Sequence, residues 1–423
     1  MRILHVVHGY PPSMGGSQWL VKNLSEQLVS RHRDEVSVFT TVAYRMEHFW
    51  RSDEPAMPAG EQEINGVTVR RFPVFNRLNA LRWFSAGVAY RLRLPYNDWL
   101  RTMYTGPLIC GMAQAIANSG AEVVFATAFP LMHMYYALAG ARRAGIPIVF
   151  LGAIHTADEW GYDRKMIYRA IQEADAYVAH TSYERDHLIE RGIQPEKIVI
   201  IGAGVDARRF DVADGRTTRR RYNWGEAPVV AAMGKQTARK HFDTLLVAMR
   251  RVWTVHPNAH VLIAGARTAY SRRIEEMIEI LPAEQQARVI VLSDFPEEEK
   301  PDLLAACDIF ALPSGMESFG IAFLEAWACS KPVIGARAGA IPSVIDEGQD
   351  GLLFTYQDAD DLARAILELL ADPAGRARMG AAGRQKVLQN YTWEIVTDRL
   401  REVYVRVRDV PPLPLGDDLS SPR

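Results

Sequence analysis

Residues 312–354 read LPSGMESFGIAFLEAWACSKPVIGARAGAIPSVIDEGQDGLLF. The apolar run 309–312 and the proline that follows it predict a buried parallel strand that ends in a loop. A helix is expected over 320–328, where apolar residues recur at helical spacing, with Ser318 in the N-cap position. A strand, a loop and a helix start in this order are typical of the ligand-binding edge of an open α/β sheet.

The start of this expected helix suits a phosphate group. The backbone N–H groups of Phe319, Gly320 and Ile321 would have no partner inside the helix, and they carry the positive end of its dipole. Glu317 lies in the preceding loop and Glu325 lies inside the helix. A carboxylate on an apolar face needs hydrogen-bond donors, which either a sugar's vicinal hydroxyls or a neighbouring basic side chain would supply.

The same segment resembles the donor-site signature of the retaining GT-B glycosyltransferases of family 4, also called group 1. That signature is approximately PS-x-x-E-x-FG-x-x-x-x-EA-x-A-x-G-x-PV, followed by a small-residue loop and dG-x-x-Glll. The residues that match it are Glu317, Phe319, Gly320, Glu325, Pro332, Val333, Gly339 and Gly351. The resemblance implies that a sugar moves, with retention, from a nucleotide diphosphosugar to a hydroxyl acceptor.

The resemblance also implies the GT-B fold, an α/β architecture of two doubly wound, Rossmann-like domains that face each other across a cleft. A chain of 423 residues is long enough for both, and alternating strand and helix patterns predict a parallel sheet in each. Strands are expected in the first domain at Ile3–Val7, Val36–Thr40, Val67–Phe72, Val123–Ala126, Ile148–Leu151, Ala176–Ala179 and Lys197–Ile201. The expected organisation is an acceptor-side domain (1–206), an Arg-rich linker (207–226), a donor domain (227–388), a helix that crosses back to the first domain (389–408) and a disordered tail (409–423).

Two lysines in the loop after the first strand of the donor domain suit a diphosphate. Lys235 and Lys240 could also form an ordinary solvated pair. The family has G-R/K-x-x-x-x-K here, so the resemblance implies that both cations contact the leaving diphosphate. It further implies that Arg267 and Phe295 lie near the nucleobase and the ribose.

In the first domain, Gly15 and Gly16 could admit a phosphate or a sugar, although turn formation alone explains such a pair. His155 follows an expected strand, where a side chain points into the ligand crevice of an α/β sheet. The resemblance implies that His155 lies beside the donor sugar and that Gly16 faces the diphosphate. The sequence contains neither G-x-G-x-x-G nor a Walker A lysine motif.

Cleavage of the bond between the sugar and the diphosphate separates charge, so fixed donors aimed at the leaving phosphate would lower the barrier. We assign this role to Lys235, Lys240, Gly16 and the helix start at 320–321, and expect no metal or other cofactor to be required. A D-x-D string at 358–361 lies at an expected helix start, which favours capping over metal binding.

Glu317 would hold sugar hydroxyls, Glu325 would hold the ribose, and His155 would orient the sugar. No carboxylate is plainly placed as a covalent nucleophile, so we expect front-face attack with the leaving phosphate as the base. The donor base stays open among UDP, the commonest, GDP and ADP, and the acceptor can be a glycan, a lipid-linked glycan or a small molecule. The alternatives are a non-catalytic scaffold subunit that binds nucleotide sugars and a sugar-nucleotide epimerase on the same fold.

The composition is that of an ordinary globular protein. Apolar residues make up 48%, charged residues 23%, and the formal net charge of −1 gives no reason to expect a nucleic-acid partner. The three cysteines are far apart and are expected to be reduced, as in a cytoplasmic protein. The first apolar run is too short for a signal peptide, and no run is long enough to span a membrane.

Residues 70–101 mix arginines with aromatic side chains. Such a segment can lie on an anionic membrane surface, or it can form a solvated face around an acceptor cleft. Peripheral contact with the inner face of the membrane is therefore one of two hypotheses for this segment.

Overall fold

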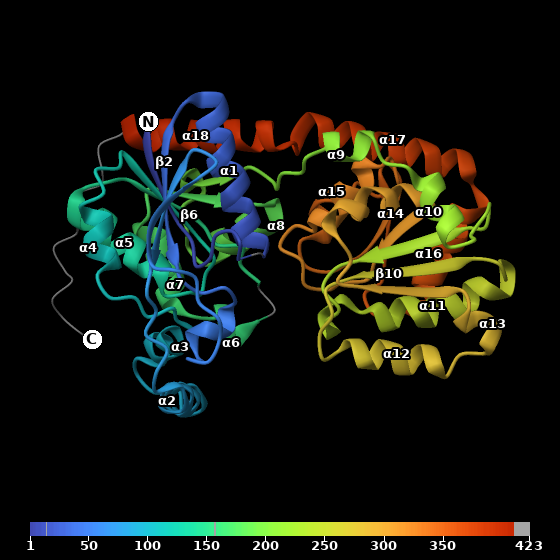
Figure 1. Cartoon of the computed structure of the whole chain (residues 1–423), viewed down its shortest axis with the longest axis horizontal. Helices are drawn as coiled ribbons and strands as arrows, with labels where there is room; N and C mark the ends of the chain where they lie inside the picture. Colours follow the sequence, from blue (N-terminus) through green and yellow to red (C-terminus); the bar gives the residue numbers. More distant parts are fainter. Residues whose placement is uncertain (14, 156–157, 410–423) are drawn as a thin grey trace. The chain divides into compact units, whose positions relative to one another are not determined.

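The computed structural model describes residues 1–13, 15–155 and 158–409, which divide into two compact units. The first comprises Met1–His180, Glu184–Ile201 and the chain from Val396 onward, and the second comprises Thr181–Tyr183 and Gly202–Ile395. Each unit contains a sheet with helices packed against it (Figure 1). The predicted disordered tail lies outside the described residues, apart from Asp409.

The first unit has an eight-stranded sheet with the order β3-β4-β2-β1-β5-β6-β7-β8. Its strands are β1 (Arg2–Val6), β2 (Glu35–Thr41), β3 (Gly60–Ile64), β4 (Val67–Phe72), β5 (Val123–Thr127), β6 (Ile148–Leu151), β7 (Ala176–Ala179) and β8 (Ile198–Ile200). The predicted strands are confirmed in a parallel sheet, where most of their apolar runs are buried and β8, at the edge, is partly exposed. Only β3 pairs antiparallel, and its polar, exposed sequence GEQEI was not predicted as a strand.

The helices of this part of the chain are α1 (Gly16–His32), α2 (Asn79–Arg91), α3 (Asn97–Thr105), α4 (Met112–Ala117), α5 (His133–Ala144), α6 (Glu159–Tyr162), α7 (Lys165–Glu173) and α8 (Ser182–Glu190). The C-terminal helix α18 (Trp393–Asp409) packs on the first unit from Val396 onward. Its buried side chains at 396, 400, 403, 404 and 407 form one apolar stripe. Tyr404 Oη is hydrogen-bonded to His5 Nε2 at 3.1 Å, and Arg401 pairs with Asp34 at 2.7 Å.

The second unit has a six-stranded, fully parallel sheet with the order β11-β10-β9-β12-β13-β14. Its strands are β9 (Val229–Met233), β10 (His260–Gly265), β11 (Val289–Ser293), β12 (Ile309–Leu312), β13 (Val333–Ala336) and β14 (Gly351–Phe354). Counted along the chain, this is the doubly wound order 3-2-1-4-5-6. The order reverses between the neighbours β9 and β12, so the loops that follow these two strands diverge at a crevice.

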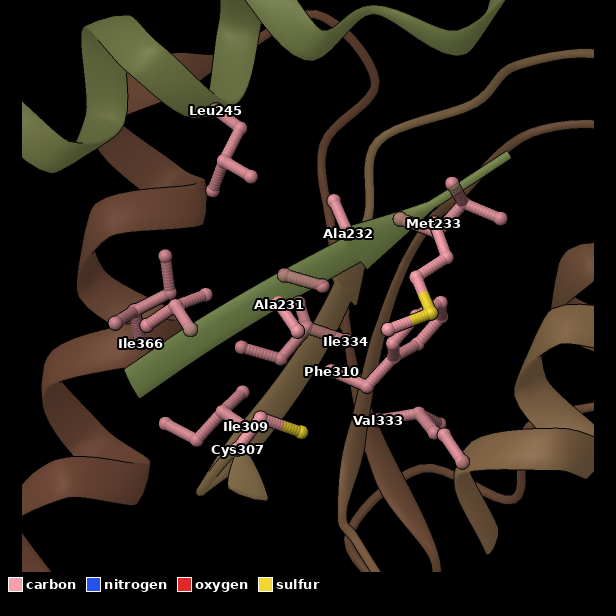
Figure 2. Packing of buried hydrophobic residues seen from close by; sticks show 14 of the residues in the cluster. Ala231, Ala232, Met233, Leu245, Cys307, Ile309, Phe310, Val333, Ile334 and Ile366 are labelled. Carbon is pink, nitrogen blue, oxygen red and sulfur yellow. The ribbon is translucent and has the colours of Figure 1, made fainter. Parts of the chain in front are cut away.

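Its helices are α9 (Arg208–Asp211), α10 (Gly215–Arg221), α11 (Phe242–Val255), α12 (Ser271–Glu279), α13 (Ala283–Gln286), α14 (Lys300–Ala306), α15 (Ile321–Ala328), α16 (Ala359–Ala371) and α17 (Pro373–Asn390). Figure 2 shows Ala231, Phe310 and Ile334 of three adjacent strands together with Leu245 of α11 and Ile366 of α16, and all five belong to one cluster of buried apolar residues. Burying each larger side chain of this cluster contributes about 1.5–3 kcal/mol.

The segment predicted as a linker, 207–226, contains α9 and α10 and packs inside the second unit. Asp214 caps α10 by accepting hydrogen bonds from the N–H groups of Arg216 and Thr217. A Cβ on Gly215 would lie 2.6 Å from the backbone of Ala305, so α10 lies directly against α14. The arginines of α10 lie mostly on the exposed side of a packed helix. Their number in the sequence is why composition alone suggested a linker.

Candidate active site

The loops that follow β9 and β12 bring two of the predicted residues together. Lys240 Nζ donates a hydrogen bond to Glu317 Oε1 at 2.5 Å, and both side chains are only 14% exposed. Lys240 ends a short 3₁₀ turn (Ala238–Lys240), and Glu317 lies in the loop before α15. The pair therefore lies at the point where the strand order reverses, which is where doubly wound sheets bind ligands.

Glycines shape the loop that carries Lys240. A Cβ on Gly234 would lie 3.2 Å from Lys240 Cε, so the lysine side chain runs closely along the backbone. A Cβ on Gly265, at the end of β10, would lie 1.9 Å from the carbonyl oxygen of Gly234. Gly265 also has a φ of 153°, so only glycine lets the ends of β9 and β10 approach this closely.

Further hydrogen bonds hold the two loops. Ser314 Oγ donates to the carbonyl oxygen of Arg239 at 3.2 Å, and His241 Nε2 is hydrogen-bonded to Tyr356 Oη at 2.7 Å. Lys235, by contrast, is exposed, and its side chain makes no hydrogen bond or ion pair within the described ranges. Of the two predicted cations, the structure therefore anchors only Lys240.

The start of α15 differs from the prediction. The N-cap is Gly320, with φ 94° and ψ 60°, and the helix begins at Ile321. The prediction of Ser318 as N-cap is wrong, because the chain enters the helix through a left-handed residue, a conformation that glycine adopts at little cost. The Phe323 N–H donates to the Gly320 carbonyl oxygen at 2.9 Å, and the start of α15 remains a candidate for binding an anion. Phe319 is buried, and its ring packs against Tyr391.

Glu325 has a basic partner that the sequence did not identify. Lys300 Nζ donates to Glu325 Oε1 at 2.9 Å, and the two side chains are 17% and 16% exposed. Burial raises the pKa of Glu325, and Lys300 opposes that rise without abolishing it. Burial lowers the pKa of Lys300, but Glu325 and Glu297 more than offset this, so the pKa lies above its usual value.

The loops after β10 and β11 meet beside the same crevice. The Arg267 N–H donates to Asp294 Oδ1 at 3.0 Å, while the Arg267 guanidinium pairs with Glu275 at 2.6 Å. Phe295 packs partly buried against the core. Gln236 was missed by the sequence interpretation: it is fully buried, and its Oε1 has no hydrogen-bond partner among the described residues. Such an acceptor is costly unless a ligand or water donates to it.

Three predicted residues lie in the first unit. Gly15 is extended (φ 171°) and precedes α1, whose first residue is Gly16. A Cβ on Gly16 would meet no atom within 4 Å, so this position faces open space. His155 follows β6, is half-buried, and has its ring edge-on to Tyr162 with centroids 5.5 Å apart.

The D-x-D string is confirmed as a helix cap. Asp358 Oδ1 accepts hydrogen bonds from the N–H groups of Asp360 and Asp361, both at 3.0 Å. In the described part of the chain, no group of three or more His, Cys, Asp or Glu side chains could hold a metal ion. No helix there is both long and apolar enough to cross a membrane.

Two family models match this chain. The model for Glycosyltransferase Family 4 matches residues 14–209, and the model for Glycosyl transferases group 1 matches residues 214–386. The two matches lie one after the other and cover most of both units.

Two bacterial mannosyltransferases are similar in sequence. The GDP-mannose-dependent alpha-(1-6)-phosphatidylinositol monomannoside mannosyltransferase of Mycolicibacterium smegmatis is 27% identical over 416 residues, 95% of this chain and 97% of that protein. The GDP-mannose-dependent monoacylated alpha-(1-6)-phosphatidylinositol monomannoside mannosyltransferase of Corynebacterium glutamicum is 35% identical over 212 residues. That alignment covers 48% of this chain and 54% of the Corynebacterium protein, about half of each.

Solved structures share the fold. Anabaena HepE in complex with UDP and glucose has a TM-score of 0.72 at 19% identity, covering 96% of this chain and all of that one. Sucrose-phosphate synthase from Thermosynechococcus elongatus also has a TM-score of 0.72 at 19% identity, covering 96% of this chain and 99% of that one. The fold is therefore GT-B, the architecture of a large class of glycosyltransferases.

The chain belongs to glycosyltransferase family 4. It is a glycosyltransferase that depends on a nucleotide sugar.

Proposed function

We propose that this enzyme transfers a hexose from a nucleoside diphosphate sugar to a hydroxyl acceptor with retention of the anomeric configuration. The observation that carries the proposal is the Lys240–Glu317 pair beside the start of α15, where the strand order reverses. In the proposed reaction the bond between C1 and the phosphate oxygen breaks, and the acceptor oxygen bonds to C1 on the same face. The acceptor's proton passes to the leaving phosphate.

Lys240 and the first N–H groups of α15 would stabilise the charge that develops on the leaving diphosphate. Donors fixed at such a position contribute about 10²–10³-fold each to turnover. Lys235 would add a more distant, solvated charge. Glu317 would accept hydrogen bonds from the sugar hydroxyls and hold Lys240 in place before the donor binds.

We propose that Glu325 accepts hydrogen bonds from the ribose and that Arg267, Phe295 and the buried Gln236 belong to the nucleoside side of the same site. In the first unit, Gly16 would admit the diphosphate and His155 would orient the sugar. Ser318 and Phe319 would act through the loop backbone, because the Phe319 ring is buried.

GDP-mannose is the first donor to test, because the relative that aligns over almost its whole length is named as GDP-mannose-dependent. UDP-glucose is the second, because HepE has been solved with UDP and glucose. The acceptor that both mannosyltransferase names specify is a phosphatidylinositol mannoside, which is an anionic lipid. We therefore propose a lipid-linked acceptor at a membrane surface.

Helix α2 and its flanks support this proposal for the acceptor. Leu81, Trp83 and Phe84 are each 61% exposed, whereas Arg82 is buried and donates to the carbonyl oxygens of Phe49, Met103 and Tyr104. Apolar side chains outside and an arginine inside are the reverse of an ordinary surface helix. Figure 1 shows α2 projecting beyond α3 at the edge of its unit.

The charge of this region fits an anionic bilayer. Residues 64–97 contain six arginines and no acidic residue, and basic side chains beside exposed aromatics are typical of membrane-surface segments. Replacing both Trp83 and Phe84 by Ala should abolish cosedimentation with vesicles that contain anionic phospholipid. Ile280→Ala, which removes an even more exposed apolar side chain from the second unit, should leave it unchanged. Equal binding of all three proteins would refute the membrane proposal.

The transferase proposal is tested with GDP-mannose, UDP-glucose and ADP-glucose, each with EDTA and a lipid extract as the acceptor source. One donor should release nucleoside diphosphate and give a product that NMR shows to be α-linked. Glu317→Ala should lower the rate of this release about 10²-fold or more. An inverted product would contradict retention. Tight binding without turnover would favour the scaffold alternative, and a changed donor sugar would favour the epimerase.

A further inference from the structure

Four side chains of alternating charge form a chain beside α15. Glu325 pairs with Lys300 at 2.9 Å, and Lys300 pairs with Glu297 at 2.6 Å. Arg209 lies 3.6 Å from the Glu297 carboxylate and also donates to its carbonyl oxygen at 3.0 Å. All four residues belong to the second unit. Lys300 is the central member, since it alone contacts both carboxylates.

Burial distinguishes the inner pair from the outer one. The side chains of Lys300 and Glu325 are mostly covered, whereas the Glu297 side chain is half-exposed. Electrostatic interactions weaken with exposure to solvent, so the contact between Lys300 and Glu325 is the stronger of the two that Lys300 makes. The charged groups that act on Glu325 are Lys300, Glu297 and Arg209, and Lys300 has the largest effect of the three.

The backbone holds Lys300 in place. Lys300 is the first residue of α14 and is followed by Pro301, whose fixed φ favours the first turn of a helix. Its ammonium group binds Glu325 Oε1, whereas Glu325 Oε2 has no hydrogen-bond partner within the described residues. One oxygen of the carboxylate is therefore fixed, and the other is left to accept hydrogen bonds.

We propose that Lys300 is a positioning residue for the donor: it binds one oxygen of Glu325, keeps the carboxylate ionised, and so presents the other oxygen to the ribose hydroxyls. This inference rests on the proposed function, in which Glu325 contacts the ribose. It goes beyond that proposal by assigning the strength of the ribose contact to a residue outside the donor-site signature.

The test uses calorimetry to compare two affinities: that for GDP or UDP, whichever the protein binds, and that for the 2′,3′-dideoxy form of the same nucleotide. The wild type should prefer the natural nucleotide by roughly tenfold to a hundredfold, the value of hydrogen bonds to a charged group. In Lys300→Met this preference should largely disappear at neutral pH, and Lys300→Arg should restore at least part of it. A change in folding alone would weaken both nucleotides equally.

The pH dependence adds a second readout. Without Lys300, burial would raise the pKa of Glu325 further, so the carboxylate would be ionised only at higher pH. The ribose preference of Lys300→Met should therefore return as the pH rises through that pKa, whereas the wild type should lose its preference only at lower pH. The same pH profile in both proteins would overturn the inference.

Lys386 provides a matched control. Its side chain is also 17% exposed, and it also pairs with two carboxylates, Asp350 at 2.6 Å and Asp346 at 2.8 Å. Lys386→Met should lower thermal stability and leave the ribose preference intact. If Lys300→Met also retains the preference, the inference is wrong while the proposed function stands. If the wild type binds no nucleotide, or binds both forms equally, the proposed ribose contact fails and the inference fails with it.

Discussion

Two lysine–glutamate pairs lie at the two ends of the segment that runs from the β12 loop into α15. Lys240–Glu317 and Lys300–Glu325 have similar lengths, 2.5 and 2.9 Å, and similar exposure. Their supports differ. The first joins two loops that follow adjacent strands, whereas the second joins the first residue of one helix to the interior of another.

Because the two pairs have the same chemistry, we infer that their support and their number of partners decide which contact can exchange. Lys240 has one carboxylate partner among the described residues, so an arriving diphosphate has to replace one ion pair. Lys300 has two, Glu297 and Glu325, and its backbone starts a helix. We therefore expect Lys240 to leave Glu317 for the diphosphate while Lys300 keeps Glu325 in place.

The largest expected effect comes from Lys240→Met. Turnover should fall about 10²–10³-fold, because the change removes a fixed donor from the leaving group. Steady-state kinetics with the active donor would measure this effect, with Lys386→Met as the control. A fall of less than tenfold would mean that Lys240 does not act on the leaving group.

The second prediction concerns Gly265, which allows the close approach of the loop that carries Lys240. Gly265→Ala should destabilise the protein by more than the ~1–3 kcal/mol of backbone strain, because its Cβ would also meet the Gly234 carbonyl. Gly348→Ala also places alanine at a positive φ (78°, against 153° at Gly265) but meets no atom within 4 Å, so it tests strain without a clash. Thermal unfolding should show a clearly larger loss for Gly265→Ala, and equal losses would contradict the packing argument.

A smaller effect is expected when the outer partner of Lys300 is removed. Glu297→Gln frees Lys300 to interact with Glu325 alone, so the affinity for the natural nucleotide should change by less than about threefold, as is usual for exposed pairs. Calorimetry compares the nucleotide affinity of this variant with that of Lys300→Met. The comparison measures how far the Lys300–Glu325 contact depends on Glu297. A loss as large as that of Lys300→Met would show that Glu297, and not Glu325, is the important partner.

The smallest effect is expected for Lys235→Met. The side chain is exposed and unpaired in the described part of the chain, so its interaction with a diphosphate would be screened by salt. Turnover should fall by about twofold at most at low ionic strength and hardly at all at about 0.5 M salt. A salt-independent loss as large as that of Lys240→Met would place both lysines on the leaving group.

Much of the fold could be predicted from the sequence, because buried parallel strands are short apolar runs with clear ends. The strands Val67–Phe72, Ile148–Leu151 and Ala176–Ala179 show this directly. Strand β3 could not be found in this way, because an exposed edge strand has no apolar pattern. The helix at 215–221 could have been found from Asp214, a strong N-cap residue that precedes it.

The candidate site was only partly predictable. Lys240, Glu317 and Glu325 lie in a recognisable signature, and the structure pairs Lys240 with Glu317. Lys300 and Gln236 lie outside the signature, and their roles depend on side chains brought close by the fold. The Ser318 cap was predicted from residue type alone, whereas the backbone conformation of Gly320 determines where the helix starts.

Lysine side-chain NMR with and without GDP tests the contrast between the two pairs most directly, with the ¹⁵Nζ signals assigned through Lys240→Arg and Lys300→Arg. On saturation with GDP, or with UDP if that is the base bound, the Lys240 signal should shift strongly as the ammonium group moves from Glu317 to the diphosphate. The Lys300 signal should hardly move, because its contact with Glu325 is retained. An unchanged Lys240 signal together with a shifted Lys300 signal would contradict the roles assigned to both pairs.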